Sequence, residues 1–276
     1  MFLQWFPGHM TRAIRMMEEQ VKLCDGIVYV LDARAPFACL NKKLDSIFLN
    51  RPVLYLLNKA DLVSDVELKN VILEFEKNHK KAISFIGTNE KCVKTLYDAI
   101  YSSLSETIQK YKNKGLKRPL RIMVAGLPNT GKSTIINLIC GGKKARTGDK
   151  AGVTKDKQWI KVKDLEFLDT PGTTPPSFES QKLAEYLAFI GSINDDILDF
   201  QELSYILIKY LQTNYPKALL TTYNIDCSDK TEQEIFSLIA KKRGALKKGG
   251  EIDEERCGSI IISDLRKGKL GKILFL

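Results

Sequence analysis

A glycine-rich turn at residues 126–134 constrains the fold of this chain more than any other feature. It reads Gly-Leu-Pro-Asn-Thr-Gly-Lys-Ser-Thr, follows the apolar segment 120–126 and leads into the apolar segment 132–140. Glycines let a backbone curl so that its N–H groups point at phosphates, while a lysine and a serine supply a cation and a Mg²⁺ ligand. The turn therefore predicts a strand, a phosphate-binding loop and a helix. Its candidate ligands are Asn129, Thr130, Gly131, Lys132, Ser133 and Thr134.

Apolar segments of strand length alternate with helical periodicity through the first 177 residues. One helix is expected over 11–23, and another follows the capping-box residues Ser64 and Glu67. The alternation predicts a mostly parallel sheet with helices on both faces, in which ligands bind at the carboxyl ends of the strands. Strands are expected over 26–34, 52–58, 81–87, 120–126, 157–162 and 165–168.

The pattern changes after Pro175 and Pro176. Helical periodicity dominates from there to the last residue, without convincing strand alternation. We therefore expect an α/β nucleotide-binding domain over residues 1–177 and a small all-helical domain over residues 178–276.

The basic residues of the chain are unevenly distributed. The net charge is +10, and residues 1–177 hold 29 Lys and Arg against 18 Asp and Glu. Clusters such as 109–121 and 143–163 are, one by one, compatible with an ordinary solvated surface. Together they favour an RNA or polyphosphate partner, bound through phosphates and shape because aromatic RNA-binding motifs are absent.

Composition argues against several other classes of protein. The six cysteines form no Cys-x-x-Cys pair and there are two histidines, so neither zinc nor a disulfide framework is expected. The apolar runs are too short to cross a bilayer, and residues 1–20 do not resemble a signal peptide. We expect a cytoplasmic protein without a membrane partner.

A second motif, Asp-Thr-Pro-Gly at 169–172, is typical of a magnesium-binding loop. Asp169 is the expected acidic partner of Mg²⁺, and the N–H of Gly172 would contact the γ-phosphate. Thr154, in the intervening loop, would complete the magnesium ligands that begin with Ser133.

A third motif, Asn58-Lys59-x-Asp61, predicts which base is bound. A carboxylate at Asp61 can accept hydrogen bonds from N1–H and N2–H₂ of guanine, whereas adenine has no matching donors. Asn58 would brace the phosphate loop, and the stem of Lys59 would cover the base. Backbone groups of Ile86 and Gly87 are expected to close over it, so GTP and GDP are the predicted ligands.

The three loops occur in an unusual order, since the base loop precedes the phosphate loop. The simplest explanation is a circular permutation, which keeps the sheet and opens the chain just after Gly172. The new N-terminus then begins beside the γ-phosphate end of the site. Ras-like proteins position the attacking water with a glutamine, where this chain has Thr173. His9 is therefore either the group that replaces it or an exposed histidine at the start of a helix.

Several segments resemble one known family, the circularly permuted GTPases typified by ribosome biogenesis GTPase A. They are, in order, QWFPGHM, DAR, LLNKAD, GLPNTGKST, TGDKAGVTKDKQWIKV and LEFLDTPG. The resemblance covers nearly the whole chain. It implies a GTPase that binds the large ribosomal subunit and its RNA late in assembly, with His9 catalytic, Asn129 helping to hold K⁺ and the helical domain binding RNA. Thr173 and Ala151 depart from the family pattern, in which a bulky apolar residue and a proline are usual.

Two kinds of function remain open on the sequence. The leading hypothesis is a monomeric, Mg²⁺-dependent GTPase that the large subunit stimulates. The alternative is a nucleotide-gated RNA-binding protein, or a permuted GTPase acting on another RNA, in which hydrolysis is incidental.

Overall fold

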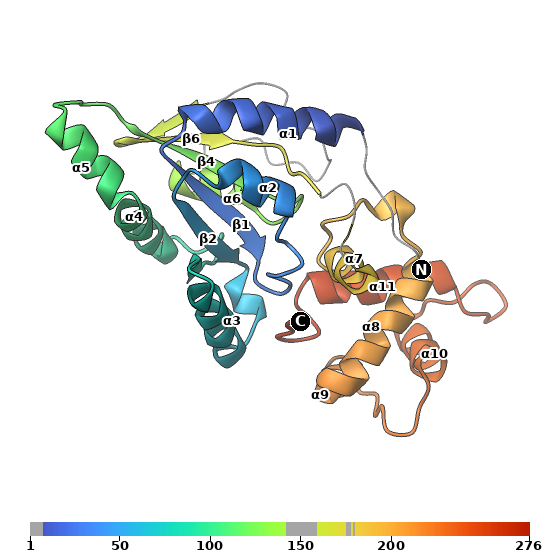
Figure 1. The fold of residues 1–276 in the computed structure, drawn as a ribbon. Coiled ribbons are helices and arrows are strands. Elements are labelled where there is room, and N and C mark those ends of the chain that lie inside the picture. The colour runs from blue at the N-terminus through green and yellow to red at the C-terminus, as the bar shows by residue number, and fades with distance from the viewer. Residues whose placement is uncertain (1–7, 142–158, 175–177, 179) are drawn as a thin grey trace. The chain divides into compact units, whose positions relative to one another are not determined.

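The computed structural model describes residues 8–141, 159–174, 178 and 180–276, which form two compact units (Figure 1). The described residues from 8 to 178, together with 274–276, make up the first, here called the α/β unit. Residues 180–273 belong to the second, the helical unit. The last three residues thus group with the α/β unit and not with the helices that precede them in the chain.

The α/β unit is built on a six-stranded sheet in the order β3-β2-β1-β4-β6-β5. All neighbouring strands are parallel except β5, which pairs antiparallel with β6. This confirms the predicted mostly parallel sheet. The strands are β1 (Gly26–Asp32), β2 (Val53–Asn58), β3 (Lys81–Ser84), β4 (Leu120–Gly126), β5 (Trp159–Val162) and β6 (Leu165–Asp169).

Helices cover both faces of this sheet, as predicted. On one face α4 (Lys91–Ser103) and α6 (Lys132–Ile139) pack their apolar residues against alternate residues of four strands. On the other face α2 (Lys42–Phe48) and α3 (Asp65–Lys77) contribute aromatic contacts, with Phe48 and Phe75 lying 5.6 and 5.3 Å from tyrosine rings of the sheet. The remaining helices of the unit are α1 (Gly8–Gln20), η1 (Val21–Leu23), η2 (Ala60–Leu62) and α5 (Ser105–Asn113).

Among the described residues, three elements differ from those expected by two residues or more. The strand expected over 26–34 ends at Asp32. The helix expected over 11–23 begins at Gly8, ends at Gln20 and continues as the short 3-10 turn η1. The strand expected over 81–87 ends at Ser84. The reason lies in Gly87, whose N–H donates to the side chain of Asn58 at 2.9 Å and so leaves the strand ladder.

The helical unit contains no strand longer than an isolated bridge within its described residues. Its core lies between α8 (Phe200–Asn214) and α11 (Glu254–Arg266). The two helices meet so closely that a Cβ at Gly258 would lie 2.5 Å from the carbonyl oxygen of Phe200. No described helix of the chain is both long and apolar enough to cross a membrane. The elements are α7 (Gln181–Phe189), η3 (Asp195–Ile197), α8 (Phe200–Asn214), α9 (Pro216–Tyr223), α10 (Glu232–Arg243) and α11 (Glu254–Arg266).

Candidate nucleotide-binding site

The three loops singled out from the sequence leave one edge of the sheet. β2, β4 and β6 end at Asn58, Gly126 and Asp169, which are the carboxyl ends of parallel strands. Within the ladder, Gly126 lies opposite Val30 and Asp169 opposite Val124. The strand register therefore brings together loops that are far apart in the chain.

The phosphate loop has a backbone that favours glycine at its two ends. Gly126 has φ of 151°, and a Cβ there would lie 2.3 Å from the carbonyl oxygen of Val30. Gly131 has φ of 98°, directly before α6. Between them, Asn129 is left-handed with φ of 59°, and the hydroxyl of the buried Thr130 donates to the carbonyl of Leu127 at 3.0 Å. Such a curl turns successive N–H groups toward one concavity, which suits an anion.

Lys132 begins α6 and is buried beneath this loop. Its Nζ donates to the carbonyl oxygen of Leu127 at 2.8 Å. Burial lowers the pKa of Lys132 to about 8, an effect that the carboxylate of Asp169 partly offsets. A phosphate beside this ammonium would raise the pKa again, because an opposite charge favours the charged form. Thr134, two residues further along α6, is exposed.

Ser133 and Asp169 form an oxygen pair at the start of α6. The hydroxyl of Ser133 donates to Oδ2 of Asp169 at 3.1 Å, while the buried Oδ1 of Asp169 has no hydrogen-bond partner in the described part of the chain. Burial raises the pKa of Asp169, and Lys132 counters that rise. A hydroxyl and an unsatisfied carboxylate oxygen are ligands that Mg²⁺ prefers, so the pair fits this ion. Thr154, the third predicted ligand, lies outside the described residues.

The magnesium loop, residues 169–172, packs against the phosphate loop, residues 126–134, at Gly172. A Cβ on Gly172 would lie 2.6 Å from the backbone nitrogen of Pro128, so only glycine fits there. The next residue, Thr173, is fully buried, and its N–H donates to the carbonyl of Gly126 at 3.4 Å. Its side chain is therefore closed off from solvent, and its Oγ1 has no hydrogen-bond partner among the described residues.

The start of α1 lies beside the magnesium loop. The hydroxyl of Thr174 donates to Sδ of Met10 at 2.7 Å, and both side chains are buried. His9 directly precedes Met10 in α1. The side chain of His9 lies outside the described residues, so its predicted role stays a prediction.

Asn58 connects the base loop to two other loops. Its amide nitrogen donates to the carbonyl of Thr130 at 2.8 Å across 72 residues of chain, and its amide oxygen accepts from the N–H of Gly87. A Cβ at Gly131 would lie 2.3 Å from the same amide nitrogen. The loop after β3 is closed by a turn in which the carbonyl of Ile86 accepts from the N–H of Asn89. One buried side chain thus holds three loops at a common place.

Lys59 and Asp61 occupy the turn beyond Asn58. Lys59 has φ of 60°, and its Nζ donates to the carbonyl oxygen of Asn129 at 2.9 Å. The base loop is therefore within hydrogen-bonding distance of the phosphate loop. Asp61, in η2, is exposed, so its carboxylate is accessible to a ligand.

Two further charged residues at this edge had no role assigned from the sequence. Asp32 and Arg34 are almost fully buried, and the guanidinium donates to both carboxylate oxygens at 2.9 and 2.8 Å. Nζ of Lys59 also lies 2.8 Å from Oδ2 of Asp32. Burial alone would raise the pKa of Asp32, but the two cations hold it well below its usual range. Asp32 therefore fixes the ammonium of Lys59 over the phosphate loop.

A signal for this pair was present in the sequence. The strand 26–32 is entirely buried and ends in Asp-Ala-Arg, and a buried carboxylate needs a cation nearby. What the sequence did not reveal is that Asp32 lies opposite Asn58 in the sheet. The carbonyl of Arg34 also accepts from the N–H of Phe275 at 2.7 Å, so residues 274–276 attach beside this ion pair.

Comparison with known proteins gives a consistent result. A family model described as a 50S ribosome-binding GTPase matches residues 121–236. Ribosome biogenesis GTPase A of Bacillus cereus is 39% identical over 100% of this chain and 94% of its own length. The Thermotoga maritima protein of that name is 30% identical over 99% of this chain and 94% of its own.

Solved structures agree with these sequence matches. YlqF from T. maritima bound to GNP has a TM-score of 0.68 and 29% identity, covering 96% of this chain and 97% of that one. A GDP-bound YlqF structure has the same TM-score at 28% identity, covering 95% and 98%. The resemblance predicted from the motifs is confirmed, and the chain belongs to the ribosome biogenesis GTPase A family.

Proposed function

We propose that this protein is a Mg²⁺-dependent GTPase that acts on the large ribosomal subunit late in its assembly, as a monomer in the cytoplasm. The observation that carries the nucleotide assignment is the position of Asn58, which ties the base loop, the phosphate loop and the loop after β3 together. The ribosomal assignment is supported by the names of the full-length relatives and of the matching family model.

Guanine specificity is assigned to Asp61. Its exposed carboxylate would accept hydrogen bonds from N1–H and N2–H₂ of guanine. The stem of Lys59, whose ammonium is held by Asp32 and Asn129, would lie along the base. Backbone groups of Ile86 and Gly87 would complete the wall of the base pocket.

The phosphates are assigned to the loop between Gly126 and Lys132. Its N–H groups would bind the phosphate oxygens, and the buried ammonium of Lys132 would neutralise charge that builds up during hydrolysis. Ser133, Asp169 and Thr154 would hold Mg²⁺, which supplies further neutralisation of the β- and γ-phosphates when bound. The K⁺ role of Asn129 is a further part of this proposal, checked by comparing turnover in K⁺ and Na⁺.

Water positioning is assigned to His9. Thr173 is fully buried, whereas the start of α1 lies beside the magnesium loop through Met10 and Thr174. Replacing His9 by alanine should therefore reduce turnover while leaving GTP affinity unchanged. If turnover barely changes, the alternative of a nucleotide-gated RNA-binding protein is favoured.

The coupling to RNA is assigned to the segment that follows the magnesium loop. In this proposal, bound GTP and Mg²⁺ order the nucleotide loops and set the helical unit against ribosomal RNA. Hydrolysis releases the loops, and the affinity for the particle falls.

The experiment that tests this function measures GTP turnover with and without isolated large ribosomal subunits. Without them we expect about 10⁻⁴–10⁻³ per second, as for Ras-type sites without an activator. Saturating subunits should raise the rate at least about tenfold, and small subunits serve as the control. An unchanged rate would overturn the assembly role.

A further inference from the structure

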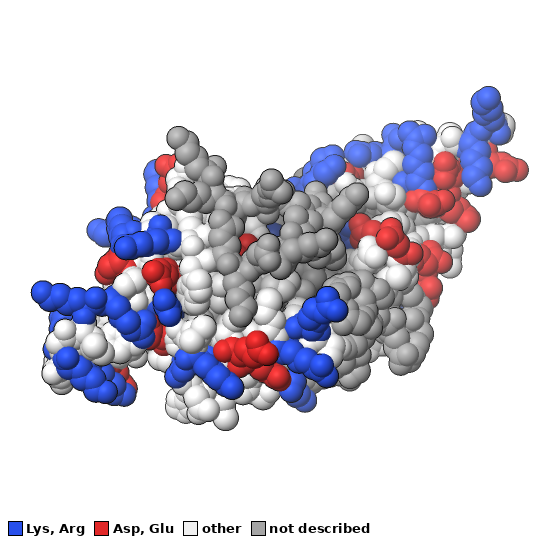
Figure 2. All heavy atoms as spheres, turned by 90° about the horizontal axis from the view of Figure 1, so that it is seen from above, with Lys and Arg blue, Asp and Glu red and all other residues white. Residues whose placement is uncertain are grey.

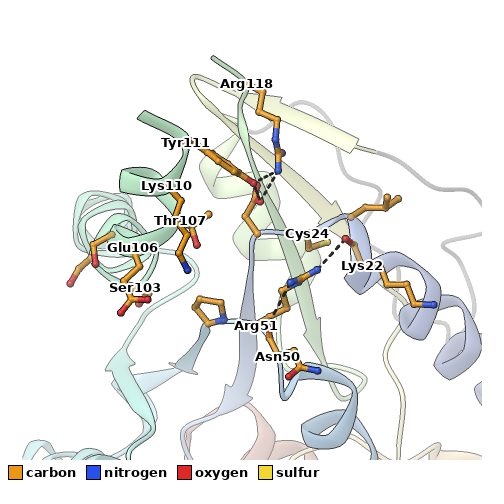
Figure 3. A pocket seen from close by; sticks show the side chains of 15 residues that line it. Lys22, Cys24, Asn50, Arg51, Ser103, Glu106, Thr107, Lys110, Tyr111 and Arg118 are labelled. Carbon is orange, nitrogen blue, oxygen red and sulfur yellow. Dashed lines mark hydrogen bonds and ion pairs between the residues drawn. The ribbon is translucent and has the colours of Figure 1, made fainter. Parts of the chain in front are cut away.

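A hollow of about 670 Å³ opens at the edge of the sheet opposite the nucleotide loops (Figure 3). Its walls come from the residues just before β1, β2 and β4 and from the junction of α4 with α5. These are the amino ends of the parallel strands, whereas the nucleotide loops follow the carboxyl ends. β2 alone has six residues, so about 20 Å of strand separates the two edges.

The hollow carries cations that have no acidic partner. Lys22, Arg51 and Lys110 line it, and none of them forms an ion pair with a carboxylate in the described residues. Lys22 and Lys110 are exposed. Glu106 also lines the hollow, and its carboxylate forms no ion pair within the described residues. The local charge therefore favours an anion.

The other lining carboxylate, Asp25, is already neutralised. Arg118 donates to its Oδ1 at 2.8 Å, the hydroxyl of Tyr111 donates to the same oxygen, and the N–H of Arg121 donates to Oδ2 at 2.8 Å. Figure 3 shows Tyr111 and Arg118 joined at one wall of the hollow. Asp25 therefore does not cancel the unpaired cations.

Arg51 is held in place by the backbone. Its guanidinium donates to the carbonyl oxygens of Val21 and Lys22, both at 3.2 Å, and of Asn50 at 3.4 Å. Three of the five N–H groups of an arginine are thus used, and two remain for a ligand. A guanidinium oriented in this way loses little side-chain freedom when it binds.

Hydroxyl groups complete the lining of the hollow. Ser105 and Thr107 supply two of them, whereas the hydroxyl of Ser103, which also lines the hollow, donates to the carbonyl oxygen of Ala99 at 2.8 Å (Figure 3). Fixed guanidinium, mobile ammonium groups and hydroxyls are the donors that proteins direct at phosphate oxygens of nucleic acids.

Further exposed cations follow the hollow along the chain. Lys112, Lys114 and Lys117 follow Lys110 on α5 and the segment after it; all are exposed, and none pairs with a carboxylate of the described chain. Figure 2 shows Lys and Arg side chains gathered on this side of the α/β unit, which carries α5. A single phosphate would need only the hollow, whereas several unpaired cations beside it suit a chain of phosphates.

We propose that this hollow, together with the exposed Lys112, Lys114 and Lys117, binds the phosphodiester backbone of RNA. The RNA then contacts the α/β unit at the edge of the sheet remote from GTP, in addition to any contact with the helical unit. That the RNA is ribosomal rests on the proposed function; the binding chemistry does not.

The test compares two double variants with the unaltered protein. Lys22→Ala with Lys110→Ala removes two cations of the hollow. Lys69→Ala with Lys94→Ala is the matched control, because these lysines are also exposed and unpaired in the described chain but lie on α3 and α4 outside the hollow. The probe is protein-free large-subunit ribosomal RNA, with binding measured by filter retention over a salt series.

We expect the hollow variant to bind about tenfold more weakly at low salt, with the plot of log affinity against log salt shallower by about two. The control should keep the affinity of the unaltered protein within about twofold, and GTP affinity should be unchanged in both variants. Equal RNA affinity in the hollow variant, an equal loss in the control, or no RNA binding by the unaltered protein would each overturn the proposal. A parallel fall in GTP affinity would contradict the independence of the two edges.

Failure of this proposal is distinct from failure of the proposed function. Stimulation of GTP turnover by large subunits is measured on the unaltered protein alone. If stimulation is absent, the assembly role falls, and the comparison of RNA affinities still decides whether the hollow binds RNA.

Discussion

The two edges of the central sheet differ in how their charged groups are held. At the carboxyl edge, Asp32, Asn58 and Lys132 are each less than a tenth exposed, and every one has fixed partners. At the amino edge, Lys22 and Lys110 are exposed and unpaired within the described residues. A small ligand with one shape requires groups held in place beforehand, whereas a polyanion requires positive charge at its surface. Substitutions of these buried groups at the first edge should therefore affect folding and GTP affinity together, and those of the two exposed lysines at the second should affect RNA affinity alone.

The largest expected effect is that of Asn58→Ala. It leaves the carbonyl of Thr130 and the N–H of Gly87 buried without partners, and each such group costs about 1–3 kcal/mol. We expect the free energy of unfolding to fall by about 4 kcal/mol, as measured by urea denaturation. Asn70→Ala, at an exposed position on α3, is the control and should change stability little. If the free energy of unfolding fell by less than about 1 kcal/mol for Asn58→Ala, Asn58 would not be what holds the three loops together.

Asp32→Asn should come next. It removes the buried negative charge that neutralises Arg34 and Lys59, and breaking a buried pair costs about 3 kcal/mol. We expect an unfolding loss of that size together with about tenfold weaker GTP binding, since Lys59 is released from its place over the phosphate loop. Asp98→Asn, at an exposed position on α4, is the control. If stability falls but GTP affinity is kept, Asp32 is structural and does not position Lys59.

Asp61→Asn should weaken GTP binding without destabilising the fold. Two charge-assisted hydrogen bonds to guanine are lost, which corresponds to about 100-fold in affinity. Because Asp61 is exposed, its unfolding free energy should stay within about 0.5 kcal/mol of the unaltered protein. Xanthosine triphosphate, which offers a carbonyl where guanine has an amino group, should bind better to the variant. Unchanged base preference would disprove the assignment of this loop.

A smaller effect is expected from pH. The pKa of Lys132 is about 8 in the ligand-free protein, so its ammonium is lost as pH rises through 8. GTP requires the charged form, and its affinity should fall about tenfold between pH 7 and 9. Stability should move in the opposite direction, rising above pH 8, because the unfolded lysine keeps its proton up to about 10.4. Binding measured by calorimetry should show proton uptake near pH 8, and Lys132→Arg should abolish the uptake.

The smallest effect separates the edges most clearly. Lys22→Ala with Lys110→Ala should leave the free energy of unfolding within about 0.5 kcal/mol, because neither side chain has a carboxylate partner in the described structure. Thermal and urea denaturation check this expectation. A loss above about 2 kcal/mol would show that the amino edge is structurally held, as the carboxyl edge is.

Much of the fold was predictable because its signals are local. The glycines of the phosphate loop, the apolar strands and the change of pattern near residue 178 are each visible within a short window. The strand predicted over 81–87 ends earlier, at Ser84. The residues after it leave the sheet, where the N–H of Gly87 donates a hydrogen bond to the side chain of Asn58, a contact that the residues of the strand alone do not reveal. The burial of Thr173 was likewise invisible, because it depends on the packing of loops from different strands.

The sequence by itself determined that three nucleotide loops share one edge of a parallel sheet, since loops that follow strands of one direction must emerge on one side whatever their order in the chain. Only the tertiary structure decided which side chains meet there. The contact of Asn58 with Thr130, the pairing of Asp32 with Lys59 and the position of Phe275 beside Arg34 depend on strand register and on the path of distant segments. No local sequence pattern predicts the strand register or the path of these segments, because both follow from how separate apolar faces are buried against one another.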